Sequence, residues 1–234
     1  QIKGKSRKEL LQFTRDFMEE VPRDKVFNCE FVAAKADGVP AEWVLAPGVD
    51  VSRRVLYIHG GAFIAGSPNS HRTVTSRFSE LANAAVLAID YRLMPENRYL
   101  DGIIDCQRAY RWILDNGPDG KASADFLVVA GDSAGGSHTL GLIAWIRDQG
   151  LQAPTAAIAL SPSTELMLTS LGSRANLESD VMLGPTVKKM ARIPMPLLWW
   201  GTVLGMRVLP TSPMASPLRG RLHGLPPTLI HVSE

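Results

Sequence analysis

The stretch that decides the fold is Gly131-Asp132-Ser133-Ala134-Gly135-Gly136, which directly follows the apolar run Phe126-Leu127-Val128-Val129-Ala130. The residues after it, 134–148, have the pattern of a helix, so the six residues form a turn between a strand and a helix. A nucleophile elbow needs this arrangement, because its serine stands on a sharp, strained turn that tolerates only small neighbours. Ser133 is therefore the candidate nucleophile, and the helix N-terminus behind it favours developing negative charge.

The bare pattern Gly-x-Ser-x-Gly is weak evidence, because glycine and serine are common residues. In a purely structural alternative, the glycines only allow tight packing and Ser133 only caps the helix. A second motif, His59-Gly60-Gly61-Ala62-Phe63 after the apolar strand 55–58, argues against that alternative. Attack on an ester carbonyl builds an alkoxide that preorganised N–H donors must stabilise. We predict that the backbone N–H groups of Gly60, Gly61 and Ala134 are these donors.

The histidines near these motifs are poor candidates for a general base. His59 stands at a strand end before the glycines, so its predicted task is to hold the loop by hydrogen bonding. His71 is expected in the first turn of a helix. His138 lies on the same helix as Ser133, about 140° around its axis, and cannot easily meet the serine. For Asp90-Tyr91-Arg92 we prefer a structural ion-pair network to a catalytic role.

Apolar strands and helices alternate along most of the chain. Near-continuous apolar strands of this kind imply a mostly parallel sheet with helices on both faces, and place functional loops at the carboxyl ends of the strands. The expected strands are 26–32, 41–45, 55–58, 85–89, 126–130, 155–160 and 227–232, with an Asp37-Gly38 turn between the first two, and the expected helices are 8–21, 70–83, 102–114 and 134–148.

We predict one α/β domain over residues 1–234, with additional elements at about 1–25 and 165–210. Residues 8–21 carry apolar side chains at helical spacing. Residues 165–210 form an insertion over the sheet, or alternatively plain core helices, because apolar stripes usually mean burial. The insertion is rich in large apolar residues, namely Leu166, Met167, Met182, Met190, Met195, Trp199, Trp200 and Met206.

Composition argues against several classes of partner. The 25 basic and 23 acidic residues give a net charge of +2, which offers nucleic acid or an anionic membrane little attraction. The most apolar stretch, 193–209, is interrupted by Pro194, Pro196 and Arg207 and is too short to span a bilayer. No signal peptide is visible, so we expect a cytoplasmic protein, with a homo-oligomer possible. Cys29 and Cys106 show no metal-ligand spacing, and we expect no metal and no cofactor.

The order of three motifs resembles the hormone-sensitive-lipase-like esterases, or bacterial family IV, of the α/β-hydrolase fold. These motifs are His59-Gly60-Gly61, then Asp90-Tyr91-Arg92-Leu93-x-Pro95-Glu96, then Gly131–Gly136. The resemblance covers nearly the whole chain and implies hydrolysis of short to medium acyl esters through an acyl-enzyme, without a cofactor. It implies Ser133 as nucleophile, Gly60, Gly61 and Ala134 as oxyanion donors, and a cap formed by 1–25 and 165–210 that shapes the substrate pocket.

Three features depart from the family pattern. Arg98-Tyr99-Leu100-Asp101 replaces a proline-rich turn, and Ser163 stands where an aromatic residue is common. More importantly, an acid and then a histidine should follow the serine in this fold. The histidines after Ser133 are His138, His223 and His231, and none fits the position of the base.

We therefore expect the catalytic acid and histidine beyond Glu234, together with one more strand and helix. Glu234 comes at or just short of the place of the acid. In a second interpretation the 234 residues are the functional unit and keep only the residual rate that binding and an oxyanion hole provide. In a third, the protein binds a small molecule without turnover, as do the plant gibberellin receptors, which resemble this family but have lost the base.

Overall fold

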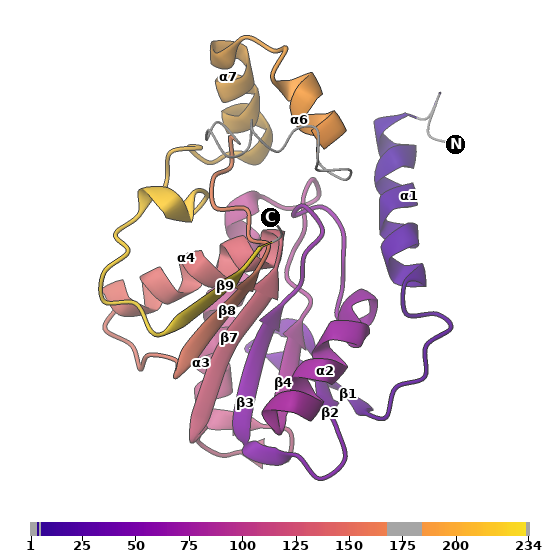
Figure 1. Cartoon of the computed structure of the whole chain (residues 1–234), viewed down its shortest axis with the longest axis vertical. Helices are drawn as coiled ribbons and strands as arrows, with labels where there is room; N and C mark the ends of the chain where they lie inside the picture. The colour runs from indigo at the N-terminus through magenta and orange to yellow at the C-terminus, as the bar shows by residue number, and fades with distance from the viewer. Residues whose placement is uncertain (1–3, 5, 168–183, 233–234) are drawn as a thin grey trace.

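The computed structural model describes residues 4, 6–167 and 184–232. A seven-stranded sheet forms its centre (Figure 1). In chain order the strands are β1 (Glu30–Ala36), β2 (Val39–Leu45), β3 (Asp50–Ile58), β4 (Ala84–Ile89), β7 (Phe126–Asp132), β8 (Ala156–Leu160) and β9 (Thr228–His231). Their spatial order is β1-β2-β4-β3-β7-β8-β9, and only the β1–β2 and β2–β4 pairs are antiparallel. The predicted mostly parallel sheet is confirmed.

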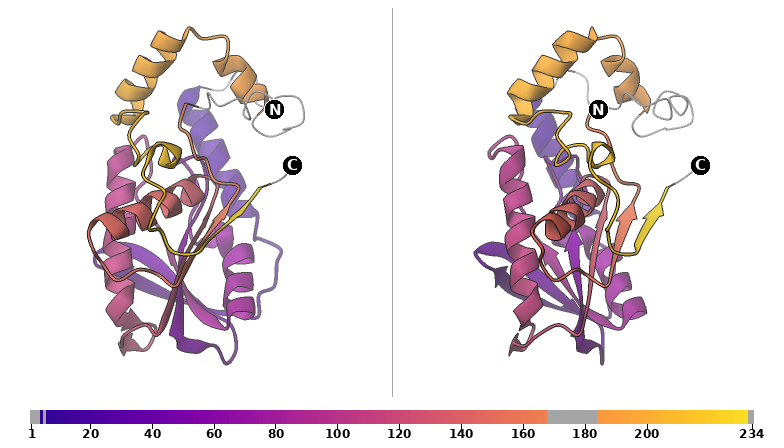
Figure 2. Two further views of the ribbon diagram at one scale, coloured as in Figure 1. Left: turned by 60° about the vertical axis from the view of Figure 1, so that its left-hand side comes forward. Right: turned by 90° about the vertical axis from the view of Figure 1, so that its left-hand side faces the viewer.

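Helices cover both faces of this sheet. Figure 2 shows α2 (Arg72–Ala82) on one face, and α3 (Tyr99–Asp115) with α4 (Ala134–Asp148) on the other. This arrangement agrees with the strand pattern, since all six residues of β4 are buried. The remaining elements are α1 (Arg7–Glu20), α6 (Gly184–Met190), α7 (Met195–Met206), the 3-10 turns η1 (Asn69–His71) and η2 (Pro217–Arg219), and a short hairpin of β5 (Asn116–Gly117) and β6 (Gly120–Lys121).

Several strand boundaries differ from the prediction, including the start of β1 at Glu30 instead of Val26, and two of the differences have a clear physical reason. β1 runs to Ala36 because it pairs with β2 up to the turn, where Asp37 and Gly38 have φ of 47° and 86°. That double left-handed conformation is the tight hairpin turn expected from the sequence. β3 begins at Asp50 rather than Val55, because its polar first half still pairs with β4 at Asp50 and with β7 at Arg53.

Helix α1 starts at a capping box, in which the Ser6 N–H donates to Glu9 at 2.7 Å and the Glu9 N–H donates to Ser6 Oγ at 3.3 Å. Its apolar side chains stay in contact with solvent, with Leu10 39% and Phe17 63% exposed. The helix is instead fastened by polar bonds. Arg15 donates to the Ile64 carbonyl oxygen at 2.7 Å and pairs with Glu96 at 2.8 Å.

Helix α7 exposes its apolar side chains to an even greater extent than α1. None of the residues of α7 is buried in the described structure, and Leu197, Trp200 and Leu204 are 58–73% exposed. The alternative of a plain core helix therefore does not hold for α7. α6 and α7 lie at one end of the molecule, beyond the sheet (Figures 1 and 2). Residues 168–183, including Met182, lie outside the described part of the chain, in which no helix is both long and apolar enough to cross a bilayer.

The opposite end of the sheet depends on a buried arginine. Arg54 in β3 is 1% exposed, and its guanidinium donates to the carbonyl oxygens of Ile113 at 2.8 Å, Val51 at 3.2 Å and Ser123 at 3.3 Å. Burial lowers the pKa of this guanidinium, but the three carbonyls provide acceptors in place of water. Ile113 lies in the last turn of α3, where carbonyl groups favour a cation.

We expect Arg54→Met to destabilise the fold by about 3 kcal/mol, because it removes the guanidinium donor from one buried and two partly buried carbonyl groups. The measurement is the free energy of unfolding in urea. Arg77→Met is the matched control, since Arg77 pairs with Glu80 on the surface and its side chain is 72% exposed. That variant should lose less than about 1 kcal/mol, and an equal loss in both variants would contradict the assignment.

Candidate active site

Ser133 lies at the junction of β7 and α4, in the strand–turn–helix that the sequence predicts. Its backbone has φ of 50° and ψ of −115°, a conformation that costs a non-glycine residue about 1–3 kcal/mol. Three backbone hydrogen bonds hold it there. Its N–H donates to the Leu160 carbonyl at 2.8 Å, and its carbonyl accepts from the Ser137 N–H at 3.0 Å and from the Ser163 N–H at 3.3 Å.

The glycines around Ser133 are required by close backbone approach. A Cβ atom on Gly135 would lie 1.9 Å from the Ile58 carbonyl oxygen, and one on Gly131 would lie 2.6 Å from the same oxygen. A Cβ on Gly136 would lie 3.1 Å from Pro162 Cβ. The first turn of α4 is therefore pressed against the carboxyl end of β3.

The glycine-rich loop after β3 begins beside this turn, since Ile58 and Gly131 pair in neighbouring parallel strands. Gly61, Ala62 and Phe63 all have positive φ, of 123°, 54° and 64°. The chain folds back sharply, so that the N–H groups of Ile64 and Ala65 both donate to the Gly61 carbonyl at 3.0 Å. A side chain at Gly61 is excluded, because its Cβ would lie 2.1 Å from the Ala65 carbonyl oxygen.

The geometry corrects one predicted donor. The Gly60 N–H already donates to Asp132 Oδ1 at 3.0 Å, so it is not available to an oxyanion. The N–H groups of Gly61, Ala62 and Ala134 donate to no acceptor within the described residues. Sequence reasoning missed Asp132 because the contact depends on how β3 and β7 lie side by side.

The carboxylate of Asp132 contacts three other segments of the chain. Its Oδ1 accepts from Tyr57 Oη at 2.7 Å and from the Gly60 N–H, and lies 3.5 Å from His71 Nε2. Burial alone would raise the pKa of this carboxyl, but the contacts with His71, Tyr57 and Gly60 together hold it below its ordinary value. The carboxyl group is therefore ionised at neutral pH.

His59 holds the loop, as predicted. It is 1% exposed, its Nδ1 lies 2.8 Å from the Gly60 carbonyl oxygen, and its ring stacks on Tyr91 with the centroids 4.4 Å apart. Burial lowers the pKa of His59 to about 4, so the ring is neutral at pH 7. A neutral ring next to a carbonyl oxygen donates from Nδ1.

The other histidines also lie where the sequence places them. His71 is the residue before α2, and its Nδ1 is 2.9 Å from Ser70 Oγ. His138 is buried on α4 among Phe63, Tyr91 and Tyr99, with ring centroids 5.0–5.4 Å apart. Burial lowers the pKa of His138 to about 3. Two further histidines lie on the surface, His223 before β9 and His231 within it, while Glu234 lies outside the described residues.

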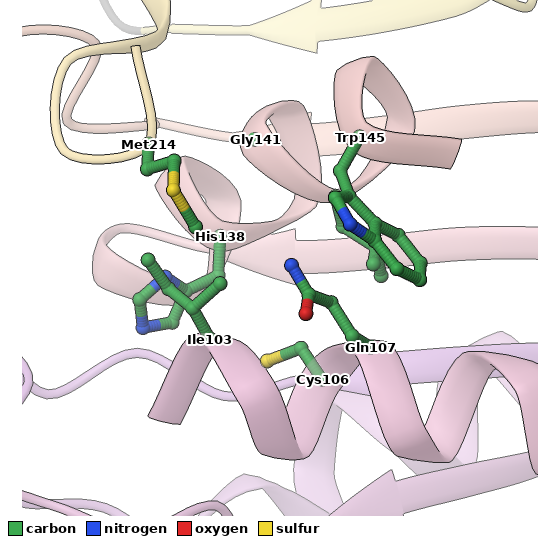
Figure 3. Close-up of a pocket in the computed structure, with 8 residues that line it drawn as sticks. Ile103, Cys106, Gln107, His138, Gly141, Trp145 and Met214 are labelled. Atoms are coloured by element: carbon green, nitrogen blue, oxygen red, sulfur yellow. The ribbon is translucent and has the colours of Figure 1, made fainter. Parts of the chain in front are cut away.

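A small cavity beside His138 is not a substrate site. It lies between α3 and α4 and has a volume of about 20 Å³. Such a volume holds about one water molecule, far below the few hundred Å³ of a ligand pocket. Figure 3 shows the side chains that converge on it, which include Ile103, Cys106, Gln107, His138, Trp145 and Met214.

The predicted ion-pair network forms around Arg92 but does not include Asp90. Arg92 donates to both carboxylate oxygens of Asp105 at 2.8 Å and lies 3.9 Å from Asp101. Asp101 also pairs with Arg98 at 2.8 Å, within the segment that replaces the proline-rich turn. These charges fix the start of α3 and have a structural role.

Comparisons with known proteins agree with the fold. A family model described as the alpha/beta hydrolase fold matches residues 55–234. An acetyl-hydrolase of Streptomyces hygroscopicus is 36% identical over 196 residues, which are 83% of this chain and 60% of the relative. The carboxylesterase/phospholipase LipF of Mycobacterium tuberculosis is 33% identical over 199 residues, or 82% and 51% of the two chains.

Solved structures give the same picture. A crystal structure of EstE5 soaked with p-nitrophenyl butyrate has a TM-score of 0.78 and 36% identity, and a hormone-sensitive lipase from a metagenome library has a TM-score of 0.80 and 30% identity. Each match covers 94% of this chain and 70% of the other. The chain spans between half and about two thirds of the length of the curated relatives it matches.

We expect Gly135→Ala to destabilise the fold by about 2 kcal/mol or more, because the new methyl group meets the Ile58 carbonyl oxygen. The matched control is Gly141→Ala on the same helix, where the nearest atom to a Cβ is 3.7 Å away. That variant should be neutral or stabilised by up to about 1 kcal/mol, from helix propensity. Urea unfolding midpoints compare the two, and equal midpoints would contradict the close packing.

A second prediction concerns pH. Since the folded pKa of His138 is about 3 and the ordinary value is 6.5, only the unfolded chain binds a proton here between these values. Stability must therefore fall as pH decreases through this range. His138→Leu should reduce the loss between pH 7.5 and pH 5 by about 2 kcal/mol. Ser137→Ala, which removes a buried group that does not titrate, should keep the parent's pH dependence. An unchanged slope in His138→Leu would refute the assignment.

Proposed function

Because this chain belongs to the hormone-sensitive-lipase-like branch of the α/β-hydrolase family, we propose that it carries the nucleophile and the oxyanion hole of a serine carboxylic ester hydrolase. The observation that carries the proposal is the strained Ser133 at the end of β7, beside a glycine-rich loop at the end of the neighbouring β3. A backbone strained at a single serine between glycines is the geometry of an activated, projecting hydroxyl. The relatives that share this fold include named esterases and an acetyl-hydrolase.

In the proposed reaction, Ser133 Oγ attacks the carbonyl carbon of the ester and its proton passes to a base. The tetrahedral intermediate then collapses to an acyl-enzyme and releases the alcohol, and water releases the acid in a second attack. The N–H groups of Gly61 and Ala134 are the proposed oxyanion donors. Ala62 takes the third place, because the Gly60 N–H is already bonded to Asp132.

The proposed substrates are short to medium acyl esters. We propose that α1 and the segment containing α6 and α7 form a cap on a single α/β domain. Both lie toward the end of the sheet at which β3 and β7 finish (Figure 1). Exposed apolar side chains on both elements, such as Phe17 and Trp200, favour an apolar acyl chain over a charged one. A charged acyl series hydrolysed at equal rates would argue against that preference.

We expect the full-length protein to hydrolyse p-nitrophenyl butyrate and a fluorophosphonate to label its Ser133, because the elbow and the donors act on both reagents. Ser133→Ala should abolish both reactions, measured by intact mass and by p-nitrophenol release. Ser137→Ala, one turn later on the same helix and buried, is the control and should keep them. Undiminished turnover in Ser133→Ala would overturn the proposal. Saturable ester binding without labelling would favour the non-catalytic binding protein.

A further inference from the structure

Both sides of the Gly60 residue are held by side chains. Asp132 Oδ1 accepts from its N–H at 3.0 Å, and His59 Nδ1 lies 2.8 Å from its carbonyl oxygen. The fit is close, since a Cβ atom at Gly60 would lie 2.2 Å from Asp132 Oδ2. The carboxylate therefore occupies the space that a side chain would fill, and Gly60 has one orientation.

The orientation of Gly60 determines that of the next N–H. In a planar trans peptide, the Gly60 C=O and the Gly61 N–H point in opposite directions. Fixing Gly60 from both sides consequently fixes the direction of the Gly61 N–H, which donates to no acceptor within the described chain. This N–H is the one that the proposed function assigns to the oxyanion.

A carboxylate near a developing oxyanion opposes it electrostatically unless its charge is engaged elsewhere. Tyr57 and the Gly60 N–H donate to Asp132 Oδ1, and His71 Nε2 lies 3.5 Å away, so three segments share this oxygen. Burial raises the pKa of Tyr57 well above its ordinary value, so its hydroxyl remains a donor. The charge of Asp132 is thus engaged by groups of the protein itself, from β3, the loop after it and the residue before α2.

We propose that Asp132 is a positioning residue for the oxyanion hole. It holds the N–H of Gly60 while His59 holds its carbonyl, so that the Gly61 N–H points at the ester oxygen. This inference rests on the proposed function. Positioning of an oxyanion donor lowers the barrier without tightening substrate binding. The signature of the role is therefore a change in kcat at constant KM.

The test compares Asp132→Ala with Asp132→Asn. Alanine removes the acceptor for Gly60, whereas asparagine keeps an oxygen in its place. We expect Asp132→Ala to lower kcat for p-nitrophenyl butyrate about 100-fold, with KM within about threefold, since loss of one oxyanion donor costs about 10²–10³. Asp132→Asn should recover kcat to within about tenfold of the parent. Equal kcat in the two variants, whether kept or lost, overturns the proposal.

A matched control separates positioning from stability. Asp105→Ala removes another buried aspartate, 3% exposed and paired with Arg92, from α3. It should lower the urea midpoint and leave kcat unchanged. If Asp132→Ala behaves in the same way, Asp132 is only structural. If Asp132→Ala does not fold, Tyr57→Phe decides, because it removes one bond to Oδ1; we expect kcat three- to tenfold lower, and an unchanged kcat overturns the proposal.

The failure of the two proposals can be told apart. If the parent protein neither hydrolyses the ester nor labels at Ser133, the proposed function fails. The positioning inference is then decided by hydrogen exchange at the Gly60 amide, measured by NMR on the parent and on Asp132→Asn and Asp132→Ala. Protection of the Gly60 amide in the parent and in Asp132→Asn, but not in Asp132→Ala, supports the positioning inference. Equal protection in all three proteins refutes it.

Discussion

Contact between the first turn of α4 and the carboxyl end of β3 constrains the whole candidate site. The Ile58 carbonyl oxygen leaves no space for a side chain at Gly135 or Gly131. Because these two residues flank Ser133, the approach forces the chain through its sharp turn and sets the serine at the edge of the sheet. It also brings the loop that follows Ile58 next to the serine. One packing contact thus accounts both for the strained backbone of Ser133 and for the position of the glycine-rich loop beside it.

Much of this arrangement could be predicted from local sequence. Alternating apolar strands and helices indicated the parallel sheet, and the two glycine motifs indicated which strand ends carry chemistry. The register between those two strands could not be predicted from local sequence. The engagement of the Gly60 N–H by Asp132 follows from the pairing of Ile58 with Gly131, which joins residues far apart in the chain. The first half of β3 could not be predicted from hydrophobicity, because its residues are largely polar although they pair with neighbouring strands.

Burial assigns the histidines near the site to structural tasks. His59 and His138 are both almost fully enclosed, and burial lowers the pKa of each, to about 4 and about 3. A ring with so low a pKa is a weak base, so it accepts the proton of a serine less readily than an ordinary histidine does. It can, however, donate a steady hydrogen bond to a backbone carbonyl, as His59 does to Gly60. The same burial that disqualifies these residues as bases makes them suitable for holding the loop.

The attachment of α1 connects this loop to the outer part of the molecule. Arg15 bonds to the Ile64 carbonyl, and Glu19 accepts from Ser67 Oγ at 2.5 Å and from Asn69 Nδ2 at 2.8 Å. These partners all belong to the segment that begins with the glycine-rich loop, so polar bonds hold α1 to that segment. Several apolar side chains of α1 are exposed to solvent, among them Leu10 and Phe17. Exposed apolar side chains such as Phe17, which is 63% exposed, support the proposal that α1 belongs to a cap, because covering them with an apolar group would be favourable. In the proposed function, α1 is held by polar bonds and contacts the acyl chain while the glycine-rich loop stays in place.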